Sequence, residues 1–370
     1  MKLWKKAVAM VLTAVTAVSL AGCGGALKQS SGTPAAGTTA AAGSAETTQA
    51  AAGEESKAKA DAKVLTMTFA LSEASPHYPA AQKFKELVEE YTDGAYTVNV
   101  FPNSSLAGGD QLGAIQMVQK GTISCGWLSP LVQCAMEPNL QALSIPWIWK
   151  DTDTIDKTLR PGTDVDKALN RILEKTGYIA VAYAENGFRQ LTNNKREVRK
   201  PEDMKGIKFR VLGSDMLFKV FNGLGADPMD MNFSELFTGL QQGAIDGQEN
   251  PISTAIVPNK YYEVQKYITL WNYVYEPHPL MFNLKLWNSF DDATKEAIQK
   301  AAVEACDYQR QISRDSTSSG IETMKAAGCE IAELTPEEIQ AFKDIADPIT
   351  EEYAKQFDEE LVSAIRAANQ

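Results

Sequence analysis

Three short polar segments contain side chains suited to holding a carboxylate: Asn186-Gly-Phe-Arg189, Lys205-Gly-Ile-Lys-Phe-Arg210 and Gly247-Gln-Glu-Asn-Pro251. The guanidinium group of an arginine is a planar, permanently charged fork that matches the geometry of a carboxylate. The amide of Asn250 can add a neutral hydrogen-bond donor. Together these side chains predict a pocket that captures a small organic anion and performs no chemistry on it.

Few residues of the chain are suited to catalysis. Its two histidines, His77 and His278, are the available bases for a serine or cysteine nucleophile, and no Gly-x-Ser-x-Gly elbow is present. The segment Gly223-Leu-Gly225 follows an expected helix and has Pro228 where a dinucleotide-binding loop needs a third glycine. We therefore expect no enzymatic activity and no cofactor.

Cysteine spacing and net charge argue against further classes of protein. Cys125, Cys134, Cys306 and Cys329 form no CxxC pair and have no neighbouring histidine, so no metal site is expected. Buried free thiols are the favoured interpretation of these cysteines, and a disulfide in an oxidising compartment is the alternative. A formal net charge of −11 without a basic stripe argues against a nucleic-acid partner.

The amino terminus has the pattern of a lipoprotein signal peptide, residues 1–22. Three lysines precede an apolar run from Ala7 to Leu20, which is shorter than the roughly 20 residues of a membrane-spanning helix. The run ends in Leu20-Ala-Gly-Cys23, which resembles a bacterial lipobox, so Cys23 is expected to carry acyl chains. An ordinary cleaved secretory peptide is the alternative. Either way, the protein is expected outside the cytoplasm, and the lipobox places it on the outer face of the cell membrane.

Residues 23–63 predict a disordered linker behind this lipid anchor. The stretch after Cys23 consists almost entirely of small and polar residues, with Leu27 as its one large aliphatic side chain, and it cannot bury a core. As a flexible coil it would reach roughly 35 Å. A globular head on this tether would remain close to the bilayer.

Strands and helices alternate in the remaining residues, which predicts an α/β fold with largely parallel sheets and two domains. Strands are expected at 64–71, 95–100, 123–127, 178–183, 207–211, 244–246, 267–275 and 280–284. Helices are expected after the turn at 75–79, from residue 110, over much of 151–175, at 217–224, for about 35 residues from Asp291, and over 336–369. Arg189, Arg210 and Asn250 all lie shortly after expected strands, where open α/β sheets bind their ligands.

Several segments of this head also resemble the solute-binding subunit of tripartite ATP-independent periplasmic (TRAP) transporters, DctP type. The resemblance rests on Gly187-Phe-Arg-Gln-Leu-Thr-Asn193, on Lys200-Pro-Glu-Asp-Met-Lys-Gly-Ile-Lys-Phe-Arg210, on Leu240-Gln-Gln-Gly-Ala-Ile-Asp-Gly-Gln-Glu-Asn-Pro251 and on Phe101-Pro-Asn-Ser-Ser-Leu106. It implies a two-lobed periplasmic-binding-protein fold with hinge strands and a long helix spanning both lobes. Lobe I would comprise 64–186 and 276–315, and lobe II 187–275 and 316–370.

The resemblance also implies roles for individual residues. Arg210 matches the principal carboxylate clamp, Arg189 a second pocket arginine, Asn250 an amide that bonds the same carboxylate, and Phe233 an aromatic that packs on the ligand. Each has a plainer alternative, namely a structural ion pair for the arginines, a turn before proline for Asn250 and a core position for Phe233.

Three further residues are pocket candidates because they are expected to lie near the crevice: His77, Trp127 and Tyr273. The last of these lies in Trp271-Asn272-Tyr273, where relatives often carry a histidine, so contacts on this side of the pocket differ from the family pattern.

The function implied by the resemblance is that of an extracytoplasmic solute-binding protein. It would close like a clamshell on a C4-dicarboxylate, a uronate or a related organic or sugar acid. It would then deliver this solute to the TRAP permease membrane subunits for ion-coupled import. A ligand-binding sensor lipoprotein that feeds a signalling receptor is the first alternative, and a structural surface protein or adhesin is the second.

Overall fold

A computed structural model describes residues 56–370, which belong to the compact unit Glu54–Gln370. The predicted signal peptide, Cys23 and most of the predicted linker lie outside the described residues. The last residues assigned to the linker are bound to the head, because the Ser56 hydroxyl donates to Glu89 Oε2 at 3.0 Å and the Lys57 backbone N–H donates to the same atom at 2.9 Å. The first strand then begins at Lys63.

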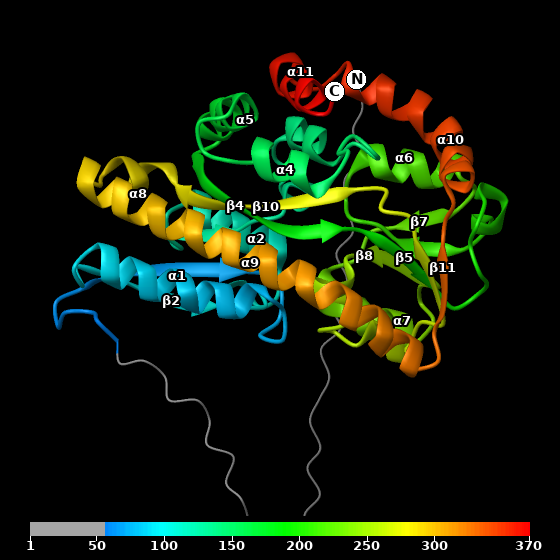
Figure 1. Cartoon of the computed structure of the whole chain (residues 1–370), viewed down its shortest axis with the longest axis horizontal. Coiled ribbons are helices and arrows are strands. Elements are labelled where there is room, and N and C mark those ends of the chain that lie inside the picture. The colour runs from blue at the N-terminus through cyan, green and yellow to red at the C-terminus, as the bar shows by residue number, and fades with distance from the viewer. Residues whose placement is uncertain (1–55) are drawn as a thin grey trace, which may run out of the picture. The chain divides into compact units, whose positions relative to one another are not determined.

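Two mixed β-sheets with helices around them form this unit (Figure 1). The first sheet has the strand order β2 (Tyr96–Phe101), β1 (Lys63–Phe69), β3 (Cys125–Trp127), β10 (Tyr275–Asn283) and β4 (Tyr178–Phe188). Strand β1 pairs in parallel with β2 and β3, whereas β10 runs antiparallel to β3 and β4.

The second sheet has the order β11 (Glu330–Glu333), β9 (Tyr267–Leu270), β5 (Gln190–Asn193), β8 (Gly247–Asn250), β6 (Lys208–Arg210) and β7 (Asp227–Met229). Parallel pairs join β11 to β9 and β6 to both β7 and β8, while β5 is antiparallel to β8 and β9. The α/β class is therefore confirmed, but both sheets are mixed where largely parallel sheets were expected.

The chain crosses between the sheets at two adjacent places. It leaves the first sheet at the end of β4 and enters β5 directly after Arg189, and it returns from β9 through residues 271–274 into β10. The two crossings are bonded to each other, since the Arg189 backbone N–H donates to the Val274 carbonyl at 2.8 Å. These crossing segments correspond to the expected hinge strands.

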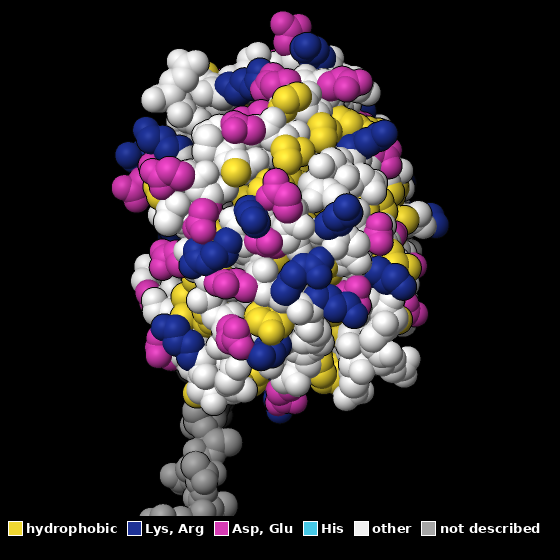
Figure 2. Space-filling model, turned by 90° about the vertical axis from the view of Figure 1, so that its right-hand side faces the viewer, with side chains coloured by type: hydrophobic (Ala, Val, Ile, Leu, Met, Phe, Trp, Pro, Cys, Tyr) yellow, Lys and Arg dark blue, Asp and Glu magenta, His cyan; other side chains and the backbone are white. Residues whose placement is uncertain are grey.

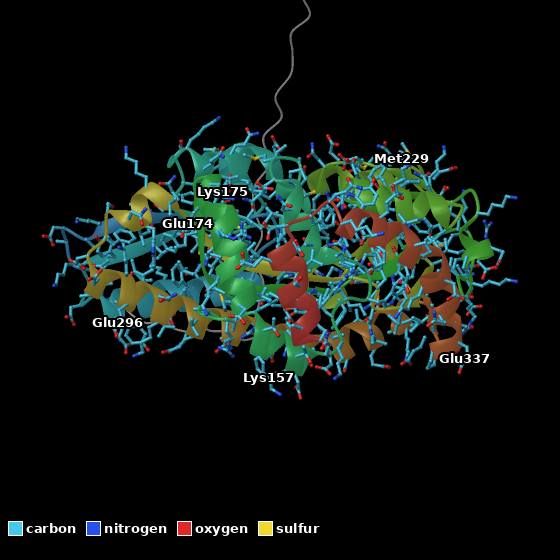
Figure 3. The ribbon with its side chains drawn as sticks, turned by 90° about the horizontal axis from the view of Figure 1, so that it is seen from above. Lys157, Glu174, Lys175, Met229, Glu296 and Glu337 are labelled. Atoms are coloured by element: carbon cyan, nitrogen blue, oxygen red, sulfur yellow. The ribbon has the colours of Figure 1, made fainter. Side chains whose placement is uncertain are left out.

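Helices cover the faces and ends of both sheets. They are α1 (His77–Tyr91), α2 (Gln111–Gln119), α3 (Pro130–Gln133), α4 (Thr152–Thr158), α5 (Asp164–Lys175), α6 (Asp215–Gly223), α7 (Leu236–Gln241), α8 (Leu284–Asn288), α9 (Asp292–Ala326), α10 (Pro336–Ala354) and α11 (Glu359–Ala368). Figure 3 shows α11 lying beside α5, and the Arg171 Nη2 donates to Asp358 Oδ1 at 2.6 Å between them. No helix within residues 56–370 combines the length and apolarity needed to cross a bilayer.

The expected long helix is confirmed as α9, which has 35 residues and passes along both halves of the unit (Figure 1). Its first turn is capped because Asp291 Oδ1 accepts the Thr294 backbone N–H at 2.7 Å. Its amino-terminal half buries apolar residues such as Ile298 and Ala302, whereas its middle buries Gln309 and Arg310 beside the crossing strands. The helix therefore changes from apolar packing to polar contacts where the chain changes sheet.

Several other expected elements were wrong in extent, among them the strands expected at 267–275 and 280–284, which are β9 and the longer β10. The expected helix over 151–175 is two helices, because Pro161-Gly162 interrupts it and Thr163 caps α5 by accepting the Asp166 N–H at 3.2 Å. The expected helix over 336–369 is likewise divided into α10 and α11. The strand expected at 244–246 instead begins at Gly247, so the polar segment Gly247–Asn250 is itself β8.

One face of the surface carries charged side chains of both signs. Figure 2 shows the end of the unit that carries β11 and α10, where basic and acidic side chains are interspersed. A continuous basic stripe of the kind that binds phosphates is not visible on this face.

Candidate ligand-binding site

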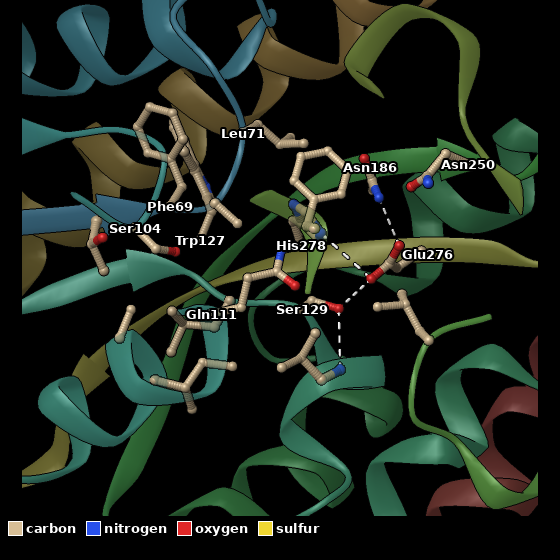
Figure 4. Close-up of a pocket in the computed structure, with 18 of the residues that line it drawn as sticks. Phe69, Leu71, Ser104, Gln111, Trp127, Ser129, Asn186, Asn250, Glu276 and His278 are labelled. Carbon is tan, nitrogen blue, oxygen red and sulfur yellow. Dashed lines mark hydrogen bonds and ion pairs between the residues drawn. The ribbon is translucent and has the colours of Figure 1, made fainter. Parts of the chain in front are cut away.

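A cavity lies where residues from both sheets come together (Figure 4). The space between its walls, including the open solvent at its mouth, is about 510 Å³. Five of the seven side chains predicted to bind ligand line it: Trp127, Arg189, Arg210, Phe233 and Asn250. Most of the remaining wall is apolar, so the charged groups are confined to one part of it.

Arg210 is an unpaired buried cation in the cavity wall. It is the last residue of β6 and is only 1% exposed. Its Nε donates to the Met231 backbone carbonyl at 2.9 Å, while its Nη1 has no hydrogen-bond partner within the described chain. Burial, and then repulsion by Arg189, lower the pKa of Arg210 from its ordinary value. A negatively charged ligand would supply the partner that this guanidinium lacks.

Arg189 also lines the cavity, but most of its donors are already used. Its Nε and Nη2 bond both carboxylate oxygens of Glu249, and its Nη1 bonds Glu276 Oε2. Burial alone would lower the pKa of Arg189, but the carboxylates of Glu249 and Glu276 outweigh it and hold that pKa above its ordinary value. The structure thus gives Arg189 the ion-pair role that was its plainer alternative, with one Nη1 hydrogen left over.

Asn250 is the last residue of β8 and lies beside Arg189. Its Oδ1 accepts from Arg189 Nη2 at 3.2 Å, and its Nδ2 donates to Gln248 Oε1 at 2.5 Å. After Pro251 the chain turns into a short π-helix, η5 (Ile252–Ile256). The amide is therefore held in place at the cavity wall by Arg189, between β4 and β5, and by Gln248 on its own strand.

Glu276, at the start of β10, connects the polar side chains of the site. Its carboxylate accepts from the Ser129 hydroxyl, from Asn186 Nδ2 at 2.7 Å and from Arg189 (Figure 4). Burial would raise the pKa of Glu276, but Arg189, His278 and Ser129 lower it well below its ordinary value. Glu276 is consequently a permanent negative charge in the cavity wall.

Two of the aromatic residues predicted to bind ligand line the cavity, and their surroundings differ. Trp127, on β3, is buried beside Phe69 at 5.8 Å between ring centroids, and its Nε1 donates to Cys306 Sγ at 3.4 Å. Phe233 is half-buried and packs edge-on against Tyr261. Both rings offer apolar surface to a ligand.

His77 and Tyr273 are not among the residues that line the cavity. The Tyr273 hydroxyl donates to Glu249 Oε2 at 2.6 Å, so this ring supports the carboxylate that holds Arg189. His77 is fully buried, and its Nε2 lies 3.1 Å from Nδ1 of His278, which does line the cavity. Both residues lie behind residues of the wall.

Two glycines allow the polar segments to reach this site. Gly187, in β4 just before Arg189, has a φ of +109°, a conformation that side chains rarely adopt. A Cβ on Gly247 would lie 2.3 Å from the Thr192 backbone carbonyl and 2.6 Å from the Phe209 ring, so β8 can fit between β5 and β6 only without a side chain there. These positions explain the glycines in the first and third sequence segments.

Sequence reasoning missed three polar side chains at this site: Glu276 and His278, which line the cavity, and Glu249, which pairs with Arg189. Glu249 lay within a quoted segment, but its polarity gave no sign that it would pair with Arg189. No local pattern around the other two residues predicted a pocket position.

The four cysteines in the described part of the chain are free. Cys125, Cys134 and Cys306 are buried, as expected, and Cys329 is half-buried. Burial raises the pKa of the Cys134 and Cys306 thiols to about 12. Residues 56–370 hold no cluster of three or more histidine, cysteine or acidic side chains placed to bind a metal.

Comparison with known proteins identifies the family to which this chain belongs. Residues 67–356 match the model of bacterial extracellular solute-binding protein, family 7. The chain is 33% identical to the C4-dicarboxylate-binding periplasmic protein DctP of Rhodobacter capsulatus over 318 residues, which cover 84% of this chain and 92% of that protein.

Two solved structures extend the comparison. A TRAP periplasmic solute-binding protein from Ralstonia eutropha, with (S)-2-acetolactate bound, is 33% identical with a TM-score of 0.77, covering 82% of this chain and 98% of that one. The sugar acid binding protein DctPAm from Advenella mimigardefordensis, in complex with galactonate, is 31% identical with a TM-score of 0.78, covering 84% and 98%. The predicted two-lobed fold is thereby confirmed, and the chain belongs to the family of TRAP periplasmic solute-binding proteins, bacterial extracellular solute-binding protein family 7.

Proposed function

We propose that this chain captures a small carboxylate-containing solute in the cavity and presents it to a TRAP permease for ion-coupled import. The observation that carries the proposal is the Arg210 guanidinium, which is buried in a cavity wall with an unpartnered Nη1. An isolated buried cation is costly, and a ligand carboxylate offsets that cost by accepting charge-assisted hydrogen bonds. Arg189 and Asn250 support the same end of the ligand.

The cavity residues come from both sheets, which supports closure of the two lobes on the ligand. Trp127 belongs to the first sheet and Arg210 to the second, so a ligand that touches both favours the form in which the sheets approach each other. The crossings at 188–190 and 270–275 are the positions about which the lobes would move. Sheet membership supports the division into lobe I, 64–186 and 276–315, and lobe II, 187–275 and 316–370.

The relatives support the class of ligand. Their names and bound molecules include C4-dicarboxylates, acetolactate and galactonate, which all contain a carboxylate. The membrane partner is proposed because the family serves TRAP transporters. Acylation of Cys23 would hold the protein at the outer face of the cell membrane, and catalysis has no part in this function.

The proposal is tested by thermal unfolding and titration calorimetry on the unit Glu54–Gln370. Small organic and sugar acids are compared with their own amides, which keep the shape and lose the charge. An acid present at a hundred times its dissociation constant should stabilise the fold by about 2.7 kcal/mol, and its amide should not. The proposal is wrong if no acid in a broad panel binds, or if amides bind as tightly as acids.

A further inference from the structure

Half of the residues that line the cavity are apolar. Six of these are Phe69, Ile115, Trp127, Leu128, Leu212 and Phe233. Six serine, threonine, asparagine and glutamine side chains line the cavity. Four are already bonded within the protein, namely Thr68 to the Phe101 carbonyl, Ser129 and Asn186 to Glu276, and Asn250 to Gln248, which leaves Ser104 and Gln111 available to a ligand. A ligand with several hydroxyl groups would leave many of them without partners, which is costly in a buried site.

Charge limits the ligand in a similar way. The carboxylates of Glu249 and Glu276 both pair with Arg189, whereas Arg210 forms an ion pair with neither. One ligand carboxylate finds the free Nη1 of Arg210, but a second one at His278 Nε2 would lie close to the anionic Glu276, which is 3.6 Å from that nitrogen. Each ion buried without a partner costs several kcal/mol. The described cavity therefore suits a single negative charge.

His278 contributes the second unpartnered nitrogen of the cavity. Within residues 56–370, Arg210 and His278 are the cavity-lining residues with a buried side-chain nitrogen that has no hydrogen bond. The atom of His278 without a hydrogen bond is Nε2, which lies 3.6 Å from Glu276 Oε1, within ion-pair distance but too far for a hydrogen bond. His278 lies next to Glu276 at the wall (Figure 4).

A chain of hydrogen bonds determines which nitrogen of His278 carries the proton. The amide of Gln309 on α9 is oriented by Glu185, whose N–H donates to Gln309 Oε1 and whose carbonyl accepts from Gln309 Nε2, both at 2.9 Å. Gln309 Nε2 and the Ser75 hydroxyl both lie 3.4 Å from His77 Nδ1. Because the Gln309 amide can only donate there and the hydroxyl can also donate, we assign His77 the tautomer with its proton on Nε2. This proton points to His278 Nδ1 at 3.1 Å, which leaves the proton of neutral His278 on Nε2, the atom at the cavity.

We propose a narrower substrate class, which rests on the proposed function. It is a small acid with one carboxylate, one carbonyl or hydroxyl oxygen and an otherwise apolar body. The carboxylate pairs with Arg210, the neutral oxygen accepts from His278 Nε2, and the apolar body packs on the aromatic and aliphatic wall. His278 is thus a specificity-determining residue that distinguishes oxygenated monocarboxylates from plain fatty acids. His77 and Gln309 are positioning residues that orient its proton.

The test is a titration series on the unit Glu54–Gln370 with four probes: 3-methyl-2-oxobutanoate, 3-methylbutanoate, succinate and galactonate. The first probe should bind at least about tenfold more tightly than each of the others, because it alone combines one charge, one acceptor and an apolar body. Tighter binding of succinate or galactonate would overturn the inference and leave the proposed function intact. Failure of every acid to bind would count against both this substrate class and the proposed function.

Variants of His278 separate a specificity role from a structural one. In His278→Phe the oxo acid should lose about tenfold in affinity while 3-methylbutanoate binds as before, so that their ratio falls towards one. If that variant does not fold, His278→Gln keeps a polar side chain and should reduce the ratio in the same direction. An unchanged ratio in a folded variant, or equal loss for both acids, would overturn the role of His278. Lys175→Gln, at the outer surface in Figure 3, is the control and should change neither affinity.

Discussion

Replacing Arg210 with glutamine removes the unpaired charge from the cavity and keeps a polar side chain. Arg210 is almost fully buried and bonds one backbone carbonyl, that of Met231, while its Nη1 has no partner among the described residues. The substitution should weaken ligand binding, because the ligand loses its charged partner. It should not destabilise the ligand-free protein, because that protein no longer buries an unpaired cation.

The expected magnitudes follow from these contacts. A hydrogen bond to a charged group contributes about 1.5 to 3 kcal/mol, so a carboxylate that accepts two from the Arg210 fork loses about 3 to 6 kcal/mol. The lower value corresponds to roughly a hundredfold weaker binding. In the ligand-free protein, burial and repulsion by Arg189 already lower the pKa of Arg210, so the neutral side chain should leave the free energy of unfolding unchanged or raise it.

Calorimetric titration and urea unfolding on wild type and Arg210→Gln measure both effects. Arg199→Gln is the matched control, because Arg199 pairs with Glu197 and Glu338 at the surface with 40% of its side chain exposed. The control should keep its affinity and lose at most about 1 kcal/mol of stability. Affinity of Arg210→Gln within threefold of wild type would refute the reasoning, as would a large loss of stability in the ligand-free variant.

Two further predictions concern the fold around the site. Gly247→Ala should lower the free energy of unfolding by about 1 to 3 kcal/mol, because its Cβ would overlap the Thr192 carbonyl, whereas Gly213→Ala, with 3.5 Å to its nearest neighbour, should have little effect in the same urea titration. Burial and His278 hold the pKa of His77 well below 6.5, so the unfolded chain binds a proton that the folded protein does not. As pH falls from 6.5 to about 5, His77 should therefore reduce the free energy of unfolding by up to about 1.4 kcal/mol per pH unit, and equal slopes for wild type and His77→Gln would contradict this.

Elements with strong local signals could be predicted from the sequence. The helix α9 follows a capping aspartate, Asp291, and keeps a helical pattern over its whole length. By contrast, the expected strand ended at residue 246, yet the four polar residues Gly247–Asn250 form β8 and all of them are buried. Polar residues can form a buried strand only when distant partners satisfy them, and such partners are not visible in a local pattern.

The same limit applies to the site. Arg189 was correctly expected near a pocket, but its pairing with Glu249 and Glu276 joins residues 60 and 87 positions apart. Nothing in the sequence around Arg189 shows whether its charge is already balanced. The place of His278 in the cavity could not be predicted either, because it depends on the pairing of β10 with β3 and β4. The position of its proton depends, through His77, on a glutamine of α9.

A structure of the unit Glu54–Gln370 with the acid that gives the largest thermal shift tests the central claim most directly. We predict a carboxylate oxygen at about 2.7 to 2.9 Å from Arg210 Nη1, with the ligand enclosed by residues of both sheets. A carboxylate bound elsewhere, with that nitrogen still unpartnered, would contradict the account.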